Sequence, residues 1–360
     1  MSGARGPADP CNSLLQGAPR DLSSDSGRKT CMNRRQFLSG AAVGSLALAV
    51  DPRAFAARLG GTWLALVTAD LESHVAVLDG WRLEPMGRIR TGPGPRSIES
   101  AHDRIAVVAH SEHGVVTLLD VDTRDIYTSE RSRIRAELDR FAAPRYTVVH
   151  PRSPIAYVTD SEAESVVAVD LRARRILSRT SVPGPARHVS ISRDGRTVWT
   201  VLGSAAERVA VLDTSDPRRP RLVRAFAAPF AAHDVVFAPD GKSVWVTSGA
   251  ERQLGIFGAG GRARRVLAAG APPQHVAFAD GTALVASGDD GTVRRHRLDG
   301  ALVREVAVPL GSYNVTFAWG LGVTPSLANG SVTSLRANGS PLARRDVGLA
   351  AHDACIVFGP

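Results

Sequence analysis

The stretch Asp234-Val-Val-Phe-Ala-Pro-Asp-Gly-Lys-Ser-Val-Trp-Val-Thr247 is the clearest structural signal in the chain. Its Asp-Gly pair stands between two runs of β-branched, aromatic and other apolar residues, which is the strongest short-range signal for a β-hairpin. The same arrangement recurs around Asp194-Gly195 and Asp280-Gly281. A third β-rich run follows each hairpin, as in residues 208–213, and a weaker fourth follows that. The sequence therefore predicts repeated four-stranded antiparallel sheets.

Extending this register along the chain gives seven equivalent residues at the start of an inner strand, which we call the first positions. They are Arg96, Arg145, Arg187, His233, Gln274, Tyr313 and His352. They are spaced 39 to 49 residues apart, and a four-stranded unit of about 40 to 45 residues is typical of a propeller blade. The longest gap is assigned to a short helical insert at residues 131–141. We therefore predict an all-β, seven-bladed β-propeller.

The two ends of the repeat array complete one blade between them. Residues 63–68 match the second strand of a blade and residues 73–79 match the third, so the first blade lacks an inner strand. Residues 352–358 fit that missing strand. Pairing of the C-terminal strand with the N-terminal blade would close the ring and remove exposed sheet edges.

Several blades resemble a known repeat. The segments Ala156–Asp160, Phe237–Gly241, Val244–Ser248 and Val166–Asp170 are similar to the YVTN-type β-propeller repeat, a WD40-like family found in exported bacterial proteins. The resemblance covers essentially residues 62–360. It implies the fold but not one activity, because the family includes binding proteins, lactonase-like enzymes and the propeller domains of redox proteins. Such repeats often carry small residues where this chain has Arg, His, Tyr and Asp.

Those unusual polar residues form the candidate site. The residues that follow the first positions, which we call the second positions, are Ser97, Tyr146, His188, Asp234, His275, Asn314 and Asp353. The next residues are mostly apolar, so the sequence predicts a polar mouth on a central channel above packed blades. The predicted ligand-binding residues are Arg96, Arg145, Arg187, His188, His233, Asp234, His275, Tyr313, Asn314, His352 and Asp353.

A purely structural role stands beside this interpretation for each residue. Polar side chains at the start of an inner strand can bond to neighbouring blades and satisfy backbone groups. The adjacent pairs His233-Asp234 and His352-Asp353 are notable because a carboxylate can raise the pKa of an imidazole or orient it as a metal ligand.

Two classes of function follow. The favoured one is an exported, non-enzymatic binding protein that presents this polar mouth to a small molecule or a partner protein. The alternative is an enzyme, either lactonase-like or lyase-like with a histidine as general base, or a metal-assisted hydrolase with His188, His275 and His352 as ligands. The chain has none of the linear motifs of zinc proteases, serine hydrolases or dinucleotide-binding enzymes. On this ground the sequence predicts no resident metal and no cofactor.

The N-terminal residues predict the location of the protein in the cell. Residues 32–39 read Met-Asn-Arg-Arg-Gln-Phe-Leu-Ser, with the pair Arg34-Arg35 followed by an apolar run and then Ala54-Phe55-Ala56. This resembles a twin-arginine export signal with an A-x-A cleavage site. We expect residues 1–31 to be a disordered extension, residues 32–56 a signal peptide, and residues 57–360 the propeller. Translation starting at Met32 is an alternative to Met1. After export and cleavage, the mature protein would be periplasmic or extracellular.

Composition limits the partners. The net charge of +9 comes from 44 basic and 35 acidic residues that are dispersed along the chain, and aromatic residues make up 5%. Nucleic-acid binding would need a clustered basic stripe or stacking platforms, so none is expected. The apolar run after Arg35 is too short to span a bilayer, so no membrane span is expected after cleavage. Only Cys355 would persist in the mature chain, which excludes an intramolecular disulfide. The oligomeric state we expect is a monomer.

Overall fold

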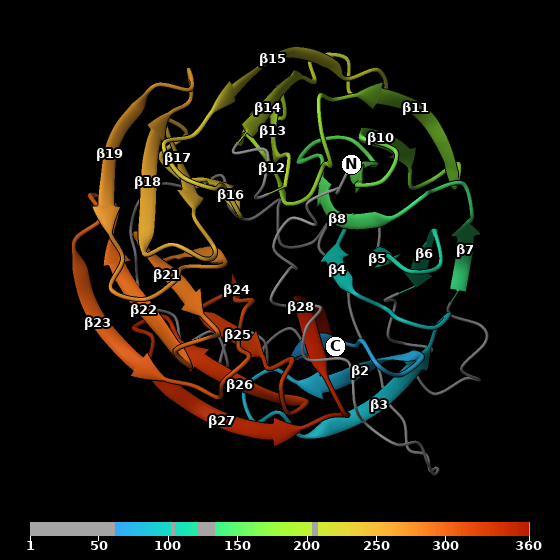
Figure 1. Ribbon diagram of the computed structural model, residues 1–360. Coiled ribbons are helices and arrows are strands. Elements are labelled where there is room, and N and C mark those ends of the chain that lie inside the picture. Colours follow the sequence, from blue (N-terminus) through green and yellow to red (C-terminus); the bar gives the residue numbers. More distant parts are fainter. Residues whose placement is uncertain (1–61, 102–104, 121–133, 204–207, 360) are drawn as a thin grey trace, which may run out of the picture.

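The computed structural model describes residues 62–101, 105–120, 134–203 and 208–359. In these residues 28 β-strands form seven four-stranded antiparallel sheets, which stand as blades around a central axis (Figure 1). The seven-bladed propeller is therefore confirmed. None of the described residues lies in a helix long and apolar enough to cross a membrane. The export segment at residues 32–56 and the extension at 1–31 lie outside the described residues.

Each blade begins at the channel and ends at the outer surface. The inner strands, in the order of blades 1 to 7, are β28 (Ala351–Gly359), β4 (Ser97–Ser100), β8 (Pro144–Val149), β12 (Val189–Ile191), β16 (Val235–Phe237), β20 (Val276–Ala279) and β24 (Thr316–Ala318). The second strands are β1 (Thr62–Ala69), β5 (Ile105–His110), β9 (Ile155–Asp160), β13 (Thr197–Val201), β17 (Ser243–Thr247), β21 (Thr282–Ser287) and β25 (Leu321–Pro325).

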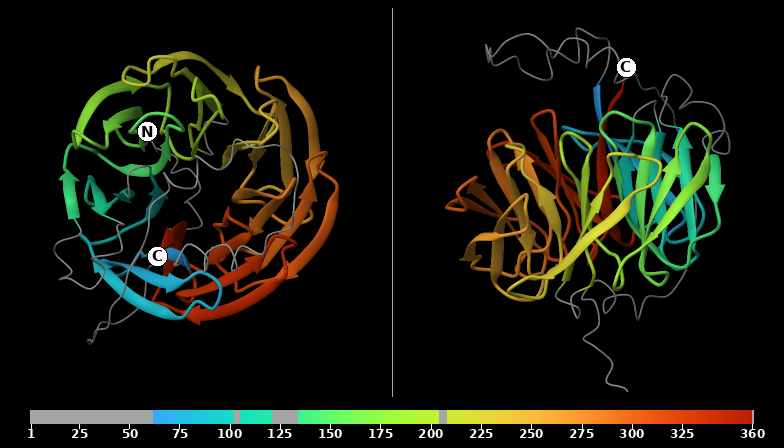
Figure 2. Two further views of the ribbon diagram at one scale, coloured as in Figure 1. Left: turned by 180° about the vertical axis from the view of Figure 1, so that it is seen from behind. Right: turned by 90° about the horizontal axis from the view of Figure 1, so that it is seen from above.

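The two remaining strands of each blade lie farther from the axis. The third strands are β2 (His74–Asp79), β6 (Val115–Asp120), β10 (Ser165–Asp170), β14 (Arg208–Asp213), β18 (Gln253–Gly258), β22 (Thr292–Arg297) and β26 (Ser331–Arg336). The outer strands are β3 (Pro85–Arg90), β7 (Ile134–Leu138), β11 (Arg175–Ser181), β15 (Arg221–Ala227), β19 (Ala263–Ala268), β23 (Leu302–Ala307) and β27 (Pro341–Asp346). The views in Figure 2 show the blades side by side around the ring, with strands running between its two faces.

The Asp-Gly turns behave as their chemistry requires. Asp280 and Gly281 connect β20 to β21 with φ angles of 41° and 74°. Positive φ at both central residues is the type I′ hairpin that Asp-Gly favours. In the longer turn between β16 and β17, the carboxylate of Asp240 accepts hydrogen bonds from the backbone N–H groups of Lys242 and Ser243 at 2.8 and 3.0 Å. These turns set the register of the inner two strands.

The ring closes through the chain ends, as the sequence predicts. Strand β28 pairs with β1 along its length, with Leu64 opposite Val357 and Val67 opposite Ala354. Blade 1 is thus built from both ends of the propeller, and its inner strand is the last one in the chain (Figure 1). Closure covers the inner edge of β1, which would otherwise be open.

The core lies between blades rather than within one layer. Side chains alternate along β1, so that Trp63 and Val67 pack against blade 7 while Leu64 and Leu66 pack against blade 2. Both faces of a blade are therefore buried. This explains why the second and third strands read as nearly continuous apolar runs instead of alternating apolar and polar residues.

One local prediction was wrong. The sequence predicted a helical insert at residues 131–141, but residues 134–138 form β7, the outer strand of blade 2. Strand β7 pairs with β6, with Val116 opposite Leu138. Its side chains alternate between half-buried Ile134, Ala136 and Leu138 and the exposed residues between them. The short segment has no strong preference of its own, and the free edge of β6 decides its conformation.

Candidate functional site

One cavity occupies the central channel. It has a volume of about 290 Å³ and is lined by residues of all seven inner strands and the segments that lead into them. All seven second positions lie on its wall: Ser97, Tyr146, His188, Asp234, His275, Asn314 and Asp353. The repeat therefore brings together residues that are far apart in sequence, because every blade enters its inner strand at the same level.

The cavity continues below the level that the sequence predicted. Side chains alternate along each inner strand, so the residue after a second position packs between blades, as Ile98 and Val235 do with 3% and 0% exposure. The residue after that faces the axis again. At this lower level Glu99, Ser190 and Thr316 line the cavity. Val148, Val236 and Ala277 line this level as well, so the channel is open and partly polar beneath its mouth rather than closed there.

The wall carries acidic and imidazole groups but no permanent cation. Glu99, Asp234 and Asp353 line the cavity together with His188 and His275, and no Lys or Arg of the described chain lines it. The sequence predicted positive charge at the mouth from Arg96, Arg145 and Arg187. These first positions each precede a wall residue in the chain, and they are buried or half-buried outside the cavity wall.

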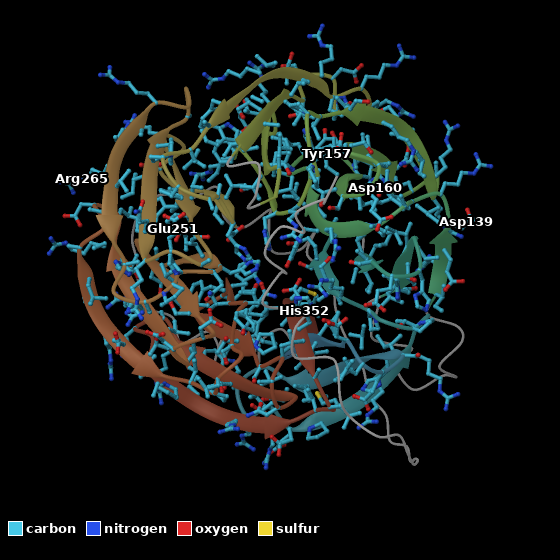
Figure 3. The ribbon with its side chains drawn as sticks, in the orientation of Figure 1. Asp139, Tyr157, Asp160, Glu251, Arg265 and His352 are labelled. Carbon is cyan, nitrogen blue, oxygen red and sulfur yellow. The ribbon has the colours of Figure 1, made fainter. Side chains whose placement is uncertain are left out.

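Several first positions bind to turns that connect the second and third strands of a blade, instead of facing the channel. The guanidinium of Arg96 in blade 2 lies 3.7 Å from Asp70 in blade 1, and Nδ1 of His352 lies 3.1 Å from the same carboxylate oxygen. Burial alone would raise the pKa of Asp70, but His352 and the arginines Arg96 and Arg145 outweigh it and lower this pKa. Figure 3 shows His352 near the centre of the ring, while Arg265 and Asp139 lie at its outer edge.

Tyr313 and Gln274 have similar partners. The hydroxyl of Tyr313 donates to Asp289 at 2.9 Å, and the side-chain amide of Gln274 donates to the carbonyl of Gly249 and accepts from the N–H of Gly288. These contacts are the structural alternative that the sequence left open. The amide of Asn314 also serves the fold, because it donates to the carbonyl of His352 at 2.7 Å.

Asp234 and Asp353 perform the same task at two blade boundaries. One carboxylate oxygen of Asp234 accepts from the N–H of Val276 in the next blade at 3.1 Å. One oxygen of Asp353 accepts from the N–H of Ile98 at 3.0 Å. Burial raises the pKa of each carboxyl to about 7, and the nearby charge of Asp353 adds to the effect on Asp234.

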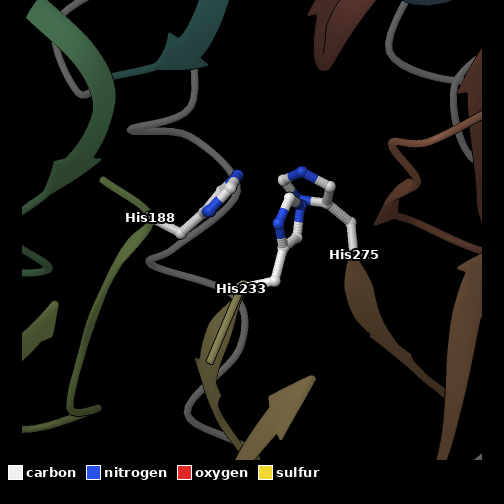
Figure 4. Close-up of side chains that lie close together, drawn as sticks. All are labelled: His188, His233 and His275. Atoms are coloured by element: carbon white, nitrogen blue, oxygen red, sulfur yellow. The ribbon is translucent and has the colours of Figure 1, made fainter. Parts of the chain in front are cut away.

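Three histidines meet at the mouth of the channel. His188 precedes β12, His233 precedes β16 and His275 precedes β20, so they come from three consecutive blades (Figure 4). The ring centroid of His188 lies 4.5 Å from that of His233 and 4.4 Å from that of His275. One ring nitrogen of each residue lies within 4.8 Å of the others. We call these three residues the histidine cluster.

Two neighbours hold the histidine cluster. Tyr146 packs against His188 with ring centroids 3.8 Å apart. Nδ1 of His275 lies 3.6 Å from the carboxylate of Asp234. The aspartate therefore lies beside a histidine of the next blade rather than orienting His233, its neighbour in sequence. The triad His188, His275 and His352 considered from the sequence does not form, because His352 faces Asp70.

Burial favours the neutral form of two members of the histidine cluster, His188 and His275. Burial holds the pKa of His188 well below its ordinary value, and the proximity of His275, His233 and Arg187 lowers it further. Burial likewise lowers the pKa of His275, with added repulsion from His233 and His352. Neutral imidazoles offer a lone pair, which is what a proton acceptor or a metal ligand requires.

Some residues of the site were not among the predicted ligand-binding residues. Ser97 and Tyr146 line the cavity, and they could have been included because they occupy second positions. Asp70 lies in the turn after β1, and nothing in its local sequence distinguishes it from other turn aspartates. Its contact with Arg96 and His352 depends on ring closure.

Comparison with known proteins identifies the fold alone. No protein-family model matches the chain, and no curated protein matches it. Solved structures that resemble it include a functionally unknown protein from Desulfotomaculum acetoxidans DSM 771, with a TM-score of 0.70 and 13% identity over 82% of this chain and 98% of that chain. Hydrazine synthase of Kuenenia stuttgartiensis has a TM-score of 0.62 and 18% identity over 73% and 89% of the two chains. Streptogramin B lyase has a TM-score of 0.59 and 11% identity over 80% and 87%. At these identities the shared architecture says nothing of a shared activity.

Proposed function

We propose that this protein is an exported binding propeller that takes up a small polar ligand in its central channel. The observation that carries the proposal is the convergence of all seven second positions on one cavity. A concave site with converging polar groups is the ordinary form of a ligand pocket, and its volume of about 290 Å³ suits a small molecule.

The wall indicates the chemistry of the ligand. It offers the carboxylates of Glu99, Asp234 and Asp353 and the hydroxyls of Ser190 and Thr316, without a lysine or arginine among its described residues. Such a wall accepts hydrogen bonds from a ligand, and above about pH 7, where Asp234 and Asp353 are mostly ionised, it attracts cations and repels anions. We therefore assign a cation, or a small molecule carrying amino or hydroxyl groups, as the ligand class.

A ligand panel tests this function. Thermal unfolding of the full-length protein should be measured with small diamines, amino acids and polyols, since a ligand at about 100 times its Kd adds about 2.7 kcal/mol of stability. Thr316→Trp fills the lower cavity and should abolish the response. Val303→Trp on the exposed face of β23 is the matched control and should keep it. Channel binding would be refuted if no compound of the panel raised the unfolding temperature of the wild type. It would also be refuted if the wild type and Thr316→Trp responded equally.

One observation favours an enzymatic alternative. His188 is a buried imidazole on the wall of the cavity, where burial holds its pKa well below the ordinary value, and Asp234 and Asp353 on the same wall have pKa values of about 7. Groups that exchange protons near neutral pH suit general acid–base catalysis. Lactones and esters are the probes for this alternative. Turnover by the wild type that disappears in His188→Ala and persists in the surface variant His113→Ala would promote the enzyme over the binding protein.

A further inference from the structure

The histidine cluster has features that ligand-lining residues alone do not require. His188, His233 and His275 come from three different blades, yet each presents one ring nitrogen within 4.8 Å of the other two. Figure 4 shows the three imidazoles directed at a common space. Each imidazole can offer a nitrogen lone pair, so three ring nitrogens that converge in this way can share one ligand.

His188 supplies an independent observation. It is 3% exposed, and neither of its ring nitrogens makes a well-formed hydrogen bond with the part of the chain that the structure describes. The backbone of His233 is close enough to affect its pKa but does not meet hydrogen-bond geometry. A buried polar group without a partner is costly and uncommon, and an unplaced ion is one of its recognised explanations.

We infer that His188, His233 and His275 form a binding site for a late first-row divalent transition-metal ion, with zinc as its natural probe. This inference rests on the proposed function, because it names a metal cation as a ligand of the channel. It also replaces the expectation of no resident metal, which the sequence supported only through the absence of linear motifs.

The donor set selects the class of ion. Imidazole nitrogen suits zinc, copper, nickel and iron, whereas calcium and magnesium require oxygen ligands. Two nitrogens that bind one zinc ion at ~2.0–2.1 Å lie ~3.3 Å apart in tetrahedral geometry. Small side-chain rotations can close the cluster from its present separation, because the rings sit at the ends of rotatable side chains rather than on rigid backbone.

The surroundings of the cluster fit a metal site. The carboxylate of Asp234 lies 3.6 Å from Nδ1 of His275, so this histidine can offer Nε2 to the ion while its other nitrogen faces a carboxylate. Carboxylate partners of this kind orient metal-binding histidines and strengthen them as ligands. Tyr146 covers one face of His188 and limits its rotation. With three protein ligands, the fourth position of the ion is open to a ligand in the channel.

The test uses zinc itself on the full-length protein. After removal of bound metal with a chelator, the protein should bind one equivalent of Zn²⁺ in competition with a chromophoric chelator. His188→Ala, His233→Ala and His275→Ala should each weaken binding by more than the ~10- to 100-fold that loss of an outer partner of a ligand costs. Exposed His113→Ala should leave zinc affinity unchanged.

A second measurement covers variants that fail to fold. Co²⁺ bound to the wild type should give the strong visible absorption of a tetrahedral, nitrogen-rich site. Absence of stoichiometric zinc, a weak octahedral cobalt spectrum, or zinc affinity that survives loss of His188 would overturn the inference. If the protein bound no stoichiometric zinc but still responded to the organic ligand panel, the metal site alone would be refuted. Failure of both probes would refute the proposed function as well.

Discussion

The carboxylate of Asp353 in blade 1 accepts a hydrogen bond of 3.0 Å from the backbone N–H of Ile98 in blade 2. The same contact joins Asp234 in blade 5 to Val276 in blade 6. At both boundaries a threonine of the second strand accepts from the N–H of the aspartate and donates to the first position of the next blade. Thr68 does this for Asp353 and Arg96, and Thr247 for Asp234 and Gln274. The ring is thus joined at two boundaries by the same polar connection, beside apolar packing.

This connection predicts a pH dependence. Burial raises the pKa of Asp353 from its ordinary value of 3.8 to about 7. Between these values the folded chain holds a proton that the unfolded chain has lost, so this group's contribution to stability is full below about pH 4 and is lost as the pH rises through about 7. In Asp353→Asn the free energy of unfolding should fall less as the pH rises from about 4 to about 7. Urea unfolding across this window measures it, and parallel curves for variant and wild type would contradict it.

Thr68 is buried and its hydroxyl connects two blades. Thr68→Val keeps the shape of the side chain but leaves the N–H of Asp353 and the carbonyl of Arg96 without this partner. We expect a loss of about 1–3 kcal/mol in the free energy of unfolding. The control Thr197→Val, at a half-buried position on β13, should change stability by less than about 0.5 kcal/mol. Equal effects of the two substitutions would show that the hydroxyl connection contributes nothing.

Ring closure through β28 predicts a strong dependence on the last strand. Ile356 is 6% exposed in the core between blades 1 and 7, so Ile356→Ala should cost about 2–5 kcal/mol. Val303→Ala on the exposed face of β23 should be nearly neutral. Removal of residues 349–360 should leave β1 with an open edge and cause aggregation. A truncated chain that stays soluble and unfolds cooperatively would mean that blade 1 does not need this strand.

Export is tested by the arginine pair, which lies outside the described residues. Replacing both Arg34 and Arg35 with Lys should leave uncleaved precursor in the cytoplasm, because the twin-arginine pathway reads the adjacent guanidinium groups. Cell fractionation with immunoblotting measures this. Substituting Arg20 and Arg28, which precede the signal, should not affect export. Normal cleavage and export of the double-Lys protein would indicate an ordinary secretory signal instead.

The repeat, the number of blades and the closure of the ring could all be predicted from the sequence. Asp-Gly turns and β-rich runs are local signals, and a repeated blade returns every inner strand to the same level, so the second positions could be placed on the channel from register alone. Local signals were too weak for residues 134–138, where the edge of β6 overrode the expected helix.

The partners of the polar residues could not be predicted from the sequence, because they depend on how the blades pack. A register places His188, His233 and His352 near the channel but does not say in which direction each side chain turns. Rotation about the side chain brings His233 to His188 and His275, while a turn carboxylate holds His352. These distances depend on how neighbouring blades pack across residues far apart in the chain. For the same reason a metal-binding set drawn from three blades leaves no motif in the sequence.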